Sequence, residues 1–255
     1  MNPTQIGLCI PPNDGEVSAA YSASVVAKLR PSWWYDHRSQ SIGMDGFVPM
    51  LWDGDVERLS LCAMRVLQAK PIPELILMLN EPELAEQANM TPEEAHRTLR
   101  RWWAEVPAWV CSVAVAGVNV SVHRGGTPYE WLERFVARLS DADRQGIAYW
   151  HIHAYGGVGA FYESVMRFKE WAQNVGMVRH VIVTECGTDD NPAALMQLLR
   201  AMVRDGVLHS AAWFSSYYDA WNDTGLMDAD GALTEAGRAW MAETHVTYLP
   251  NVTKA

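Results

Sequence analysis

The chain has 255 residues, of which 49% are hydrophobic, and it carries a formal net charge of −10. The hydrophobic content excludes a disordered chain, and no apolar run approaches the roughly 20 residues of a membrane-spanning helix. The acidic balance argues against nucleic acid as a partner, because phosphate binding calls for basic patches. The length suits one (β/α)8 barrel.

Short apolar runs, each followed by polar or turn residues, predict eight strands. They cover residues 6–10, 32–35, 47–52, 75–79, 112–118, 147–155, 180–185 and 209–214. Amphipathic stretches that alternate with them predict helices over residues 17–29, 56–67, 92–106, 128–139, 161–175, 192–202 and 232–244. Thr91-Pro92 and Asn191-Pro192 are typical helix starts, each with a capping residue before a proline, and Asp53 or Asp55 can cap the second helix.

The segment from Asp36 to Gly46 is too short and too polar for a full helix. We therefore expect an irregular connection between strands two and three. Strands that alternate with helices form parallel sheets. The sequence thus predicts a single-domain α/β protein, a (β/α)8 TIM barrel over residues 1–255.

Two features bear on the cellular compartment. Residues 1–5 lack the basic and apolar regions of a signal peptide, so either the protein is intracellular or a leader has been removed. The chain has four cysteines, which are Cys9, Cys62, Cys111 and Cys186, and no two of them form a Cys-x-x-Cys pair. Three of the four fall in or at the end of predicted buried strands. We expect free thiols in the core rather than disulfides or a zinc cluster.

Two predicted strands end in a glutamate. Residues 75–79 are apolar without alternation, as in a strand buried on both faces, and Asn80-Glu81-Pro82 follows them. Residues 180–184 lead in the same way to Glu185-Cys186-Gly187. Barrel enzymes keep their chemistry at the carboxyl ends of the strands, so both carboxylates are predicted at the barrel mouth.

Glu81 and Glu185 belong to predicted strands four and seven, whose ends face each other across a closed barrel. Glycoside hydrolysis needs two carboxyl groups, and a separation of about 5–5.5 Å lets one of them attack the sugar directly. We interpret the pair as a catalytic acid and a nucleophile. Two solvated glutamates without catalytic function are the alternative.

Polar residues near these strand ends are candidate binding residues. Asn80 could donate to a sugar hydroxyl, or it could simply cap the strand. His151 and His153 share one face of strand six, where His153 and Tyr155 are expected at the mouth, with Tyr155 donating to the nucleophile. His151 is either part of the site or a packed core histidine. His-x-His is also a metal-ligand spacing, but no further cluster completes a site, so no metal is predicted.

Tryptophans are numerous, 12 in all, and three fall at strand ends. Trp34, Trp52 and Trp213 are candidate platforms on which pyranose rings stack, although any single one suits the core as well. Tyr217, Tyr218 and Trp221, after strand eight, could extend the rim of the mouth.

At these residues the chain resembles clan A glycoside hydrolases, and among them glycoside hydrolase family 128. The matching segments are residues 33–35, 47–52, 79–83, 88–95, 131–135, 153–155 and 183–187. The resemblance implies a retaining endo-β-1,3-glucanase core, with Glu81 as acid/base and Glu185 as nucleophile. The chain departs from the family on strand two, where Asp36-His37 follows Tyr35, and this leaves the glucan linkage open.

No Gly-rich phosphate loop and no Gly-x-Ser-x-Gly elbow occurs, so no cofactor is expected. We expect an oligo- or polysaccharide as the partner. We expect the protein to be a monomer and to bind neither nucleic acid nor a membrane. Two other hypotheses stay open. One is a barrel that binds sugar without cleaving it, and the other is a metal-dependent hydrolase that uses His151, His153 and a carboxylate.

Overall fold

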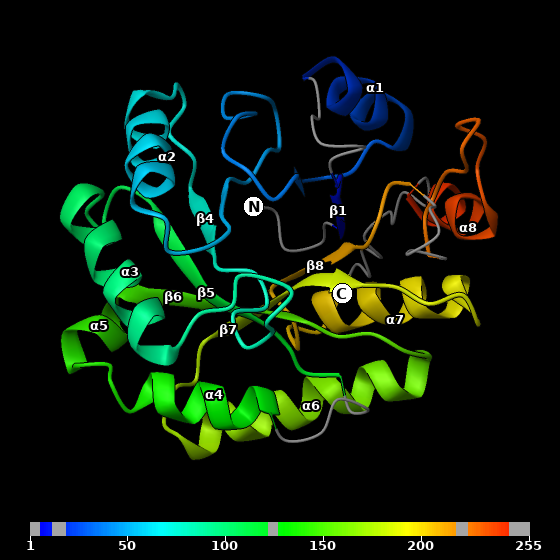
Figure 1. Cartoon of the computed structure of the whole chain (residues 1–255). Coiled ribbons are helices and arrows are strands. Elements are labelled where there is room, and N and C mark those ends of the chain that lie inside the picture. The colour runs from blue at the N-terminus through cyan, green and yellow to red at the C-terminus, as the bar shows by residue number, and fades with distance from the viewer. Residues whose placement is uncertain (1–5, 12–18, 122–126, 218–223, 245–255) are drawn as a thin grey trace, which may run out of the picture.

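The computed structural model describes residues 6–11, 19–121, 127–217 and 224–244 (Figure 1). One eight-stranded sheet has the order β2-β1-β8-β7-β6-β5-β4-β3. The strands are β1 (Ile6–Cys9), β2 (Trp34–Tyr35), β3 (Met50–Leu51), β4 (Leu75–Met78), β5 (Ser112–Asn119), β6 (Ile147–His153), β7 (His180–Cys186) and β8 (Ser210–Trp213). A parallel bridge between Trp34 and Phe47 joins the two edges of the sheet. The predicted (β/α)8 barrel is confirmed.

Helices surround the strands, as Figure 1 shows. They are α1 (Ala19–Leu29), α2 (Val56–Gln68), α3 (Pro92–Glu105), α4 (Thr127–Val136), α5 (Asp141–Gly146), α6 (Val158–Asn174), α7 (Pro192–Arg204) and α8 (Glu235–Thr244). Residues 36–49 contain no helix, so the irregular connection between β2 and β3 is confirmed. The short α5 was not predicted, although Ser140 and Asp143 form a capping box at its start.

The helix starts follow from local capping chemistry. Thr91 and Glu94 form a capping box at α3, with Pro92 in the first turn. Asn191 caps α7 by accepting from the N–H of Ala194. At α2, Asp55 rather than Asp53 is the capping residue, because its side chain accepts from the N–H of Arg58.

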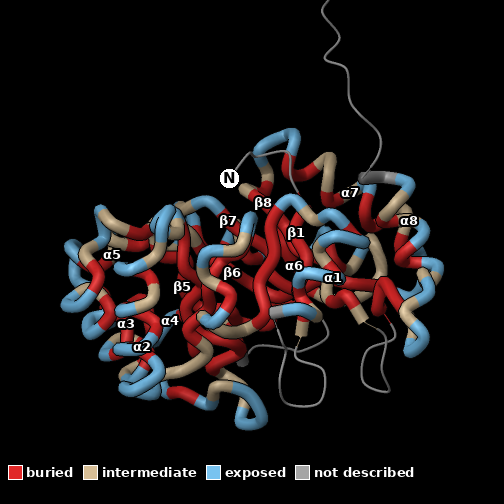
Figure 2. The backbone as a smooth tube through the Cα atoms, turned by 90° about the horizontal axis from the view of Figure 1, so that it is seen from above, coloured by how far each residue is buried: buried red, intermediate tan, exposed pale blue. Residues whose placement is uncertain are grey.

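The core has two layers because successive residues of a strand point to opposite faces of the sheet. Inward-facing side chains from several strands fill the barrel in one cluster, which includes Trp33, Tyr35, Met50 and Leu77. The larger cluster lies between the strands and the helices. Figure 2 accordingly shows buried residues along the strands and exposed residues on the outer sides of the helices.

All four cysteines are free and buried, as expected from the sequence. Among the described helices, none has the length and hydropathy that would be needed to cross a bilayer.

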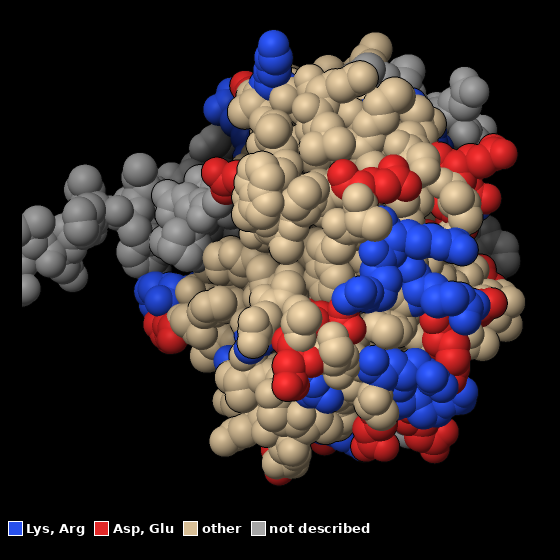
Figure 3. Space-filling model, turned by 90° about the vertical axis from the view of Figure 1, so that its left-hand side faces the viewer, with Lys and Arg blue, Asp and Glu red and all other residues tan. Residues whose placement is uncertain are grey.

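The outer face over α2 and α3 carries groups of basic side chains beside acidic ones (Figure 3). Arg100 of α3 lies 2.8 Å from Asp143 of α5, and Glu93 pairs with Arg134 of α4 at 3.6 Å and with Arg138. The Glu93 pairs are open to solvent and stabilise the protein only slightly, whereas the carboxylate of Asp143 is buried.

Candidate active site

The end of β4 leaves regular strand geometry just before Glu81. Leu79 and Glu81 have φ angles of 75° and 41°, in the left-handed region that non-glycine residues rarely adopt. The N–H of Glu81 donates to the carbonyl of Gly117 in β5 at 2.9 Å. This bond holds the backbone in a conformation that would otherwise be unfavourable, and strain of this kind concentrates at functional sites.

Gly117 makes that close approach feasible. Its φ angle is 58°, and a Cβ at this position would lie 2.4 Å from the carbonyl oxygen of Leu79 and 2.7 Å from Cε1 of His151. A side chain would therefore push β4 and β5 apart where Glu81 is anchored.

Glu185 reaches the mouth through a break in the pairing of β6 with β7. Ile152 pairs with Val183, but the next residue, His153, pairs with Glu185, so Thr184 is an extra residue. A bulge re-aims the side chains that follow it. As a result, Glu185 lies beside His153 with only 6% of its surface exposed.

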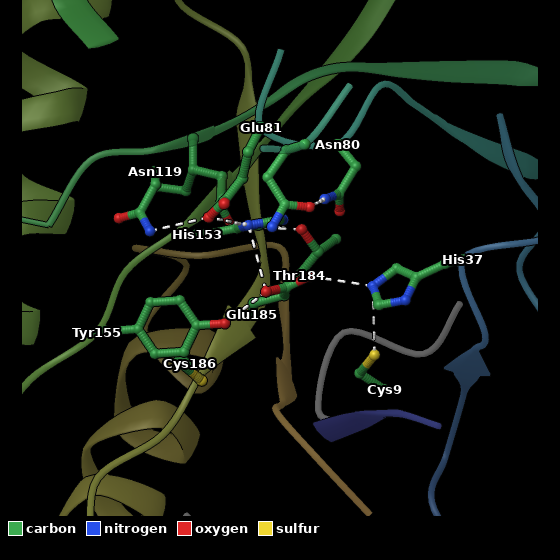
Figure 4. A network of polar contacts seen from close by, with 12 residues as sticks. Cys9, His37, Asn80, Glu81, Asn119, His153, Tyr155, Thr184, Glu185 and Cys186 are labelled. Carbon is green, nitrogen blue, oxygen red and sulfur yellow. Dashed lines mark hydrogen bonds and ion pairs between the residues drawn. The ribbon is translucent and has the colours of Figure 1, made fainter. Parts of the chain in front are cut away.

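Four side chains surround the carboxylate of Glu185 (Figure 4). His37 Nε2 lies 3.1 Å from Oε1, and the Tyr35 hydroxyl lies 3.4 Å from the same oxygen. The Tyr155 hydroxyl donates to Oε2, as predicted, and His153 Nδ1 lies 3.4 Å from it. Burial raises the pKa of Glu185, but the charge of His153 and the contacts with His37 and Tyr155 outweigh burial and hold that pKa below its ordinary value. Glu185 is thus ionised, as a nucleophile requires.

The second glutamate is held by one of its oxygens. Oε1 of Glu81 accepts from Asn119 Nδ2 at 2.8 Å and lies 3.0 Å from His153 Nδ1. The oxygen of the Asn119 amide accepts from the N–H and the hydroxyl of Ser121, so its nitrogen must face Glu81. Ser121 in turn accepts from the N–H of Tyr155. Asn119 and His153 thus both engage Oε1 of this carboxyl group.

His153 lies between the two glutamates and is fully buried (Figure 4). Burial lowers its pKa, but the carboxylates of Glu185 and Glu81 outweigh burial and raise that pKa above its ordinary value. An imidazolium between two carboxylates reduces their mutual repulsion, which allows both groups to occupy one small site.

Glu81, His153 and Glu185 offer ligand atoms that all lie within 4.8 Å of one another, a spacing that a metal ion could use. No other such group occurs among the described residues. In the structure these atoms contact each other directly, at 3.0 Å between His153 and Glu81 and 3.4 Å between His153 and Glu185. We therefore interpret the three residues as a hydrogen-bonded acid–base set.

His151 belongs to the core. Its Nδ1 contacts the Thr184 hydroxyl at 3.1 Å, its Nε2 contacts the Met78 carbonyl at 2.8 Å, and it is fully buried. Burial lowers the pKa of His151 to about 3, so it is neutral. Since neighbouring atoms occupy both nitrogens, the hypothesis of a metal site that uses His151 with His153 has no support in this geometry.

Two of the three candidate tryptophan platforms require correction. Trp34 and Trp213 are fully buried, and their indole N–H groups donate to the carbonyls of Asp45 and Thr224. Both side chains lie in the layer between strands and helices, because the alternation along β2 and β8 turns them outward. Neither can stack on a sugar.

Trp52 is the candidate that stays at the mouth. It is partly exposed, and its ring meets the ring of His37 edge-on, with centroids 5.1 Å apart. A hollow of about 410 Å³ adjoins Trp52 and His37, between the β2–β3 connection and α2. Asn80, the other candidate beside Glu81, donates its Nδ2 to Gln87 at 3.2 Å, while its buried Oδ1 has no partner among the described residues.

Several residues of the site were not singled out from the sequence. Tyr35 and His37 contact Glu185, Asn119 contacts Glu81, and the Phe214 ring lies against those of His37 and Tyr155. Phe214 ends one predicted strand, and Asn119 directly follows another. If the inward-facing positions of strand eight had been assigned one residue later, Phe214 would have been predicted at the mouth in place of Trp213. Tyr218 and Trp221 lie outside the described residues.

Comparison with known proteins adds a family and a set of similar folds. The model of the glycosyl hydrolase catalytic core matches residues 14–240. Curated protein sequences give no match.

Among solved structures, a family 128, subgroup II endo-β-1,3-glucanase of Pseudomonas viridiflava is similar, with a TM-score of 0.67 and 23% identity over 94% of this chain and 97% of the other. A subgroup I endo-β-1,3-glucanase of Amycolatopsis mediterranei in complex with laminarihexaose has a TM-score of 0.66 and 21% identity over 94% and 99%. A subgroup III curdlan-specific exo-β-1,3-glucanase of Blastomyces gilchristii has a TM-score of 0.69 and 21% identity over 93% and 97%. At these identities the likeness shows the shared fold.

Proposed function

Because this chain belongs to the glycosyl hydrolase catalytic core family, we propose that it cleaves a β-glucan with retention of configuration. Glu81 acts as acid/base and Glu185 as nucleophile. The substrate is a β-1,3-glucan and cleavage is internal. This linkage is supported by the three similar structures, which are described as β-1,3-glucanases, two of them endo-acting.

The proximity of the two carboxylates carries the proposal. An oxygen of Glu81 and an oxygen of Glu185 lie within 4.8 Å of each other. Retaining enzymes separate their carboxyl groups by about 5–5.5 Å, and inverting enzymes by about 6.5–9.5 Å, because the inverting mechanism must fit a water molecule. The observed separation favours direct attack by one carboxylate.

The hydrogen bonds divide the two roles. Glu185, ionised and held by Tyr155 and His37, attacks the anomeric carbon while Glu81 protonates the departing glycosidic oxygen from Oε2. The resulting glycosyl ester on Glu185 is hydrolysed by water, from which Glu81 removes a proton. Asn119 and His153 keep Oε1 of Glu81 in place through both steps.

Binding of the sugar chain falls to the rim of the mouth. The partly exposed Trp52 and Phe214 provide apolar surface on either side of His37. Pyranose rings stack on such surfaces. Asn80, next to Glu81, donates its amide N–H to Gln87 and keeps its amide oxygen buried, so it supports the loop of the acid/base rather than the sugar.

The test is product analysis with laminarin, curdlan, mixed-linkage glucan and cellulose, with the Glu185→Gln variant alongside. We expect the native protein alone to release oligosaccharides, and only from substrates with β-1,3 linkages. Proton NMR of the first product should show the β-anomer, as retention requires. An α-anomer would disprove the double displacement, and saccharide binding without any release would instead support a sugar-binding barrel.

A further inference from the structure

A third carboxyl group lies next to the catalytic pair, and the proposed mechanism does not use it. Oε1 of Glu83 accepts from the backbone N–H of Asn119 at 2.7 Å. Its Oε2 is buried and has no hydrogen-bond partner among the described residues. A buried carboxyl oxygen without a hydrogen-bond partner lowers the stability of the folded state, so Glu83 destabilises the protein at this position.

The surroundings of Glu83 also disfavour its ionised form. Burial raises the pKa of Glu83 to about 7, against the opposing effect of the bond from Asn119, and the charge of Glu81 raises it further. Glu81 and His153 are the ionisable groups that act on it. The carboxyl therefore changes its charge near neutral pH, beside the acid/base.

A short chain of contacts connects Glu83 to Glu81. The carboxyl of Glu83 holds the main chain of Asn119, and the side chain of the same Asn119 donates to Oε1 of Glu81 at 2.8 Å. Ser121 sets the orientation of the amide from the other side. Loss of the Glu83 contact would free the end of β5 just where it presents the amide to the acid/base.

We propose that Glu83 is a positioning residue for the acid/base Glu81. It fixes the backbone of Asn119, whose side chain holds Oε1 of Glu81. This inference rests on the proposed role of Glu81.

Two variants test the contact with Asn119. Glu83→Gln keeps an oxygen that can accept from the Asn119 N–H, whereas Glu83→Ala removes that acceptor. Glu86→Gln is the matched control, because Glu86 is an exposed carboxylate on the same loop. Thermal unfolding of all three variants identifies any that simply fail to fold.

The kinetic readout is kcat on a laminari-oligosaccharide and on an aryl β-glucoside whose leaving group needs no proton. We expect Glu83→Ala to lose on the order of tenfold in kcat on the oligosaccharide and much less on the aryl substrate, because only the oligosaccharide needs a proton from Glu81. Glu83→Gln and Glu86→Gln should stay near the native protein. Equal losses on both substrates, or no loss in Glu83→Ala, would overturn the proposal.

A second readout does not require turnover. Proton–nitrogen-15 spectra follow the backbone amide of Asn119, which donates to Glu83. In Glu83→Ala this amide signal should move and broaden, whereas in Glu83→Gln it should stay near its native position. An unchanged signal in Glu83→Ala would overturn the role of Glu83. If the native protein cleaves no glucan, the proposed function fails, while this spectrum still decides whether Glu83 holds Asn119 in place.

Discussion

Nε2 of His37 lies 3.1 Å from Oε1 of Glu185, although the two residues are 148 positions apart in the sequence. His37 follows β2, in the connection that lacks a helix, and has a φ angle of 60°. The rings of Tyr35 and Trp52 meet its ring edge-on. The irregular connection thus supplies a side chain that orients Glu185, the proposed nucleophile.

Replacement of His37 should reduce the rate more than the affinity. In His37→Ala, Glu185 keeps Tyr155 but loses a donor to Oε1, so we expect kcat on laminari-oligosaccharides to fall by about 10- to 100-fold with little change in KM. Steady-state kinetics measure this effect. His180→Ala is the control, because His180 lies at the opposite end of β7. Equal losses in both variants would show a general effect on the fold.

The acid–base set should give stability a defined pH window. The depressed pKa of Glu185 contributes stability that is present above the ordinary glutamate pKa of about 4.3 and is lost as the pH falls. The raised pKa of His153 contributes stability that is present below about 6.5 and is lost as the pH rises.

The free energy of unfolding should therefore be greatest between about pH 4.5 and 6.5. Urea titrations across this range measure it in the native protein and in Glu185→Gln. The variant should lose the dependence below pH 4.5 that belongs to Glu185. The same slope in both proteins would show that other carboxylates cause it.

Two tryptophans should respond differently to truncation. Trp34→Ala removes a fully buried indole from the layer under the helices and should cost about 3–5 kcal/mol in unfolding free energy. Trp52→Ala removes a partly exposed ring at the mouth, so it should weaken oligosaccharide binding and leave stability nearly unchanged. Chemical denaturation and calorimetric titration measure the two effects. Weaker binding in Trp34→Ala at native stability would contradict the outward orientation of that side chain.

A methyl group at Gly117 should damage the site through the backbone. Gly117→Ala would add strain at a positive φ, worth about 1–3 kcal/mol, and would bring its Cβ against Leu79 and His151. Gly176→Ala is the matched control, because Gly176 has a φ angle of 68° and nothing within 4 Å of its added Cβ. We expect both variants to lose stability but only Gly117→Ala to lose activity, as measured by denaturation and turnover.

The regular parts of the fold could be predicted because their causes are local. Apolar runs without alternation indicate strands that are covered on both faces, and Thr91 and Asn191 cap their helices through contacts within one turn. The polar composition of residues 36–46 was enough to exclude a helix there. Glu81 and Glu185 could be assigned to the mouth because each directly follows such a run.

The direction of each side chain at the mouth could not be predicted in the same way. Successive residues of β2 and β8 alternate between the inside and the outside of the barrel, and pairing with the neighbouring strands decides which residues face inward. Trp34 and Trp213 face outward as a result, while Phe214 faces inward. The bulge at Thr184 and the left-handed residues at Leu79 and Glu81 interrupt that alternation where the two glutamates emerge. Asn119 shows no signal of its own, since its role depends on where Glu81 points.

By itself, the sequence determined a barrel, its two strand-end glutamates and the absence of a helix between β2 and β3, because each follows from burial and capping along a few consecutive residues. The contact of Tyr155 with Glu185 was also predicted, but only the tertiary structure decided the other contacts. It set His37 on Glu185, Asn119 and His153 on Glu81, and Glu83 behind them. These contacts join strands that are distant in sequence, and their geometry depends on strand register and bulges, which arise when the whole sheet closes.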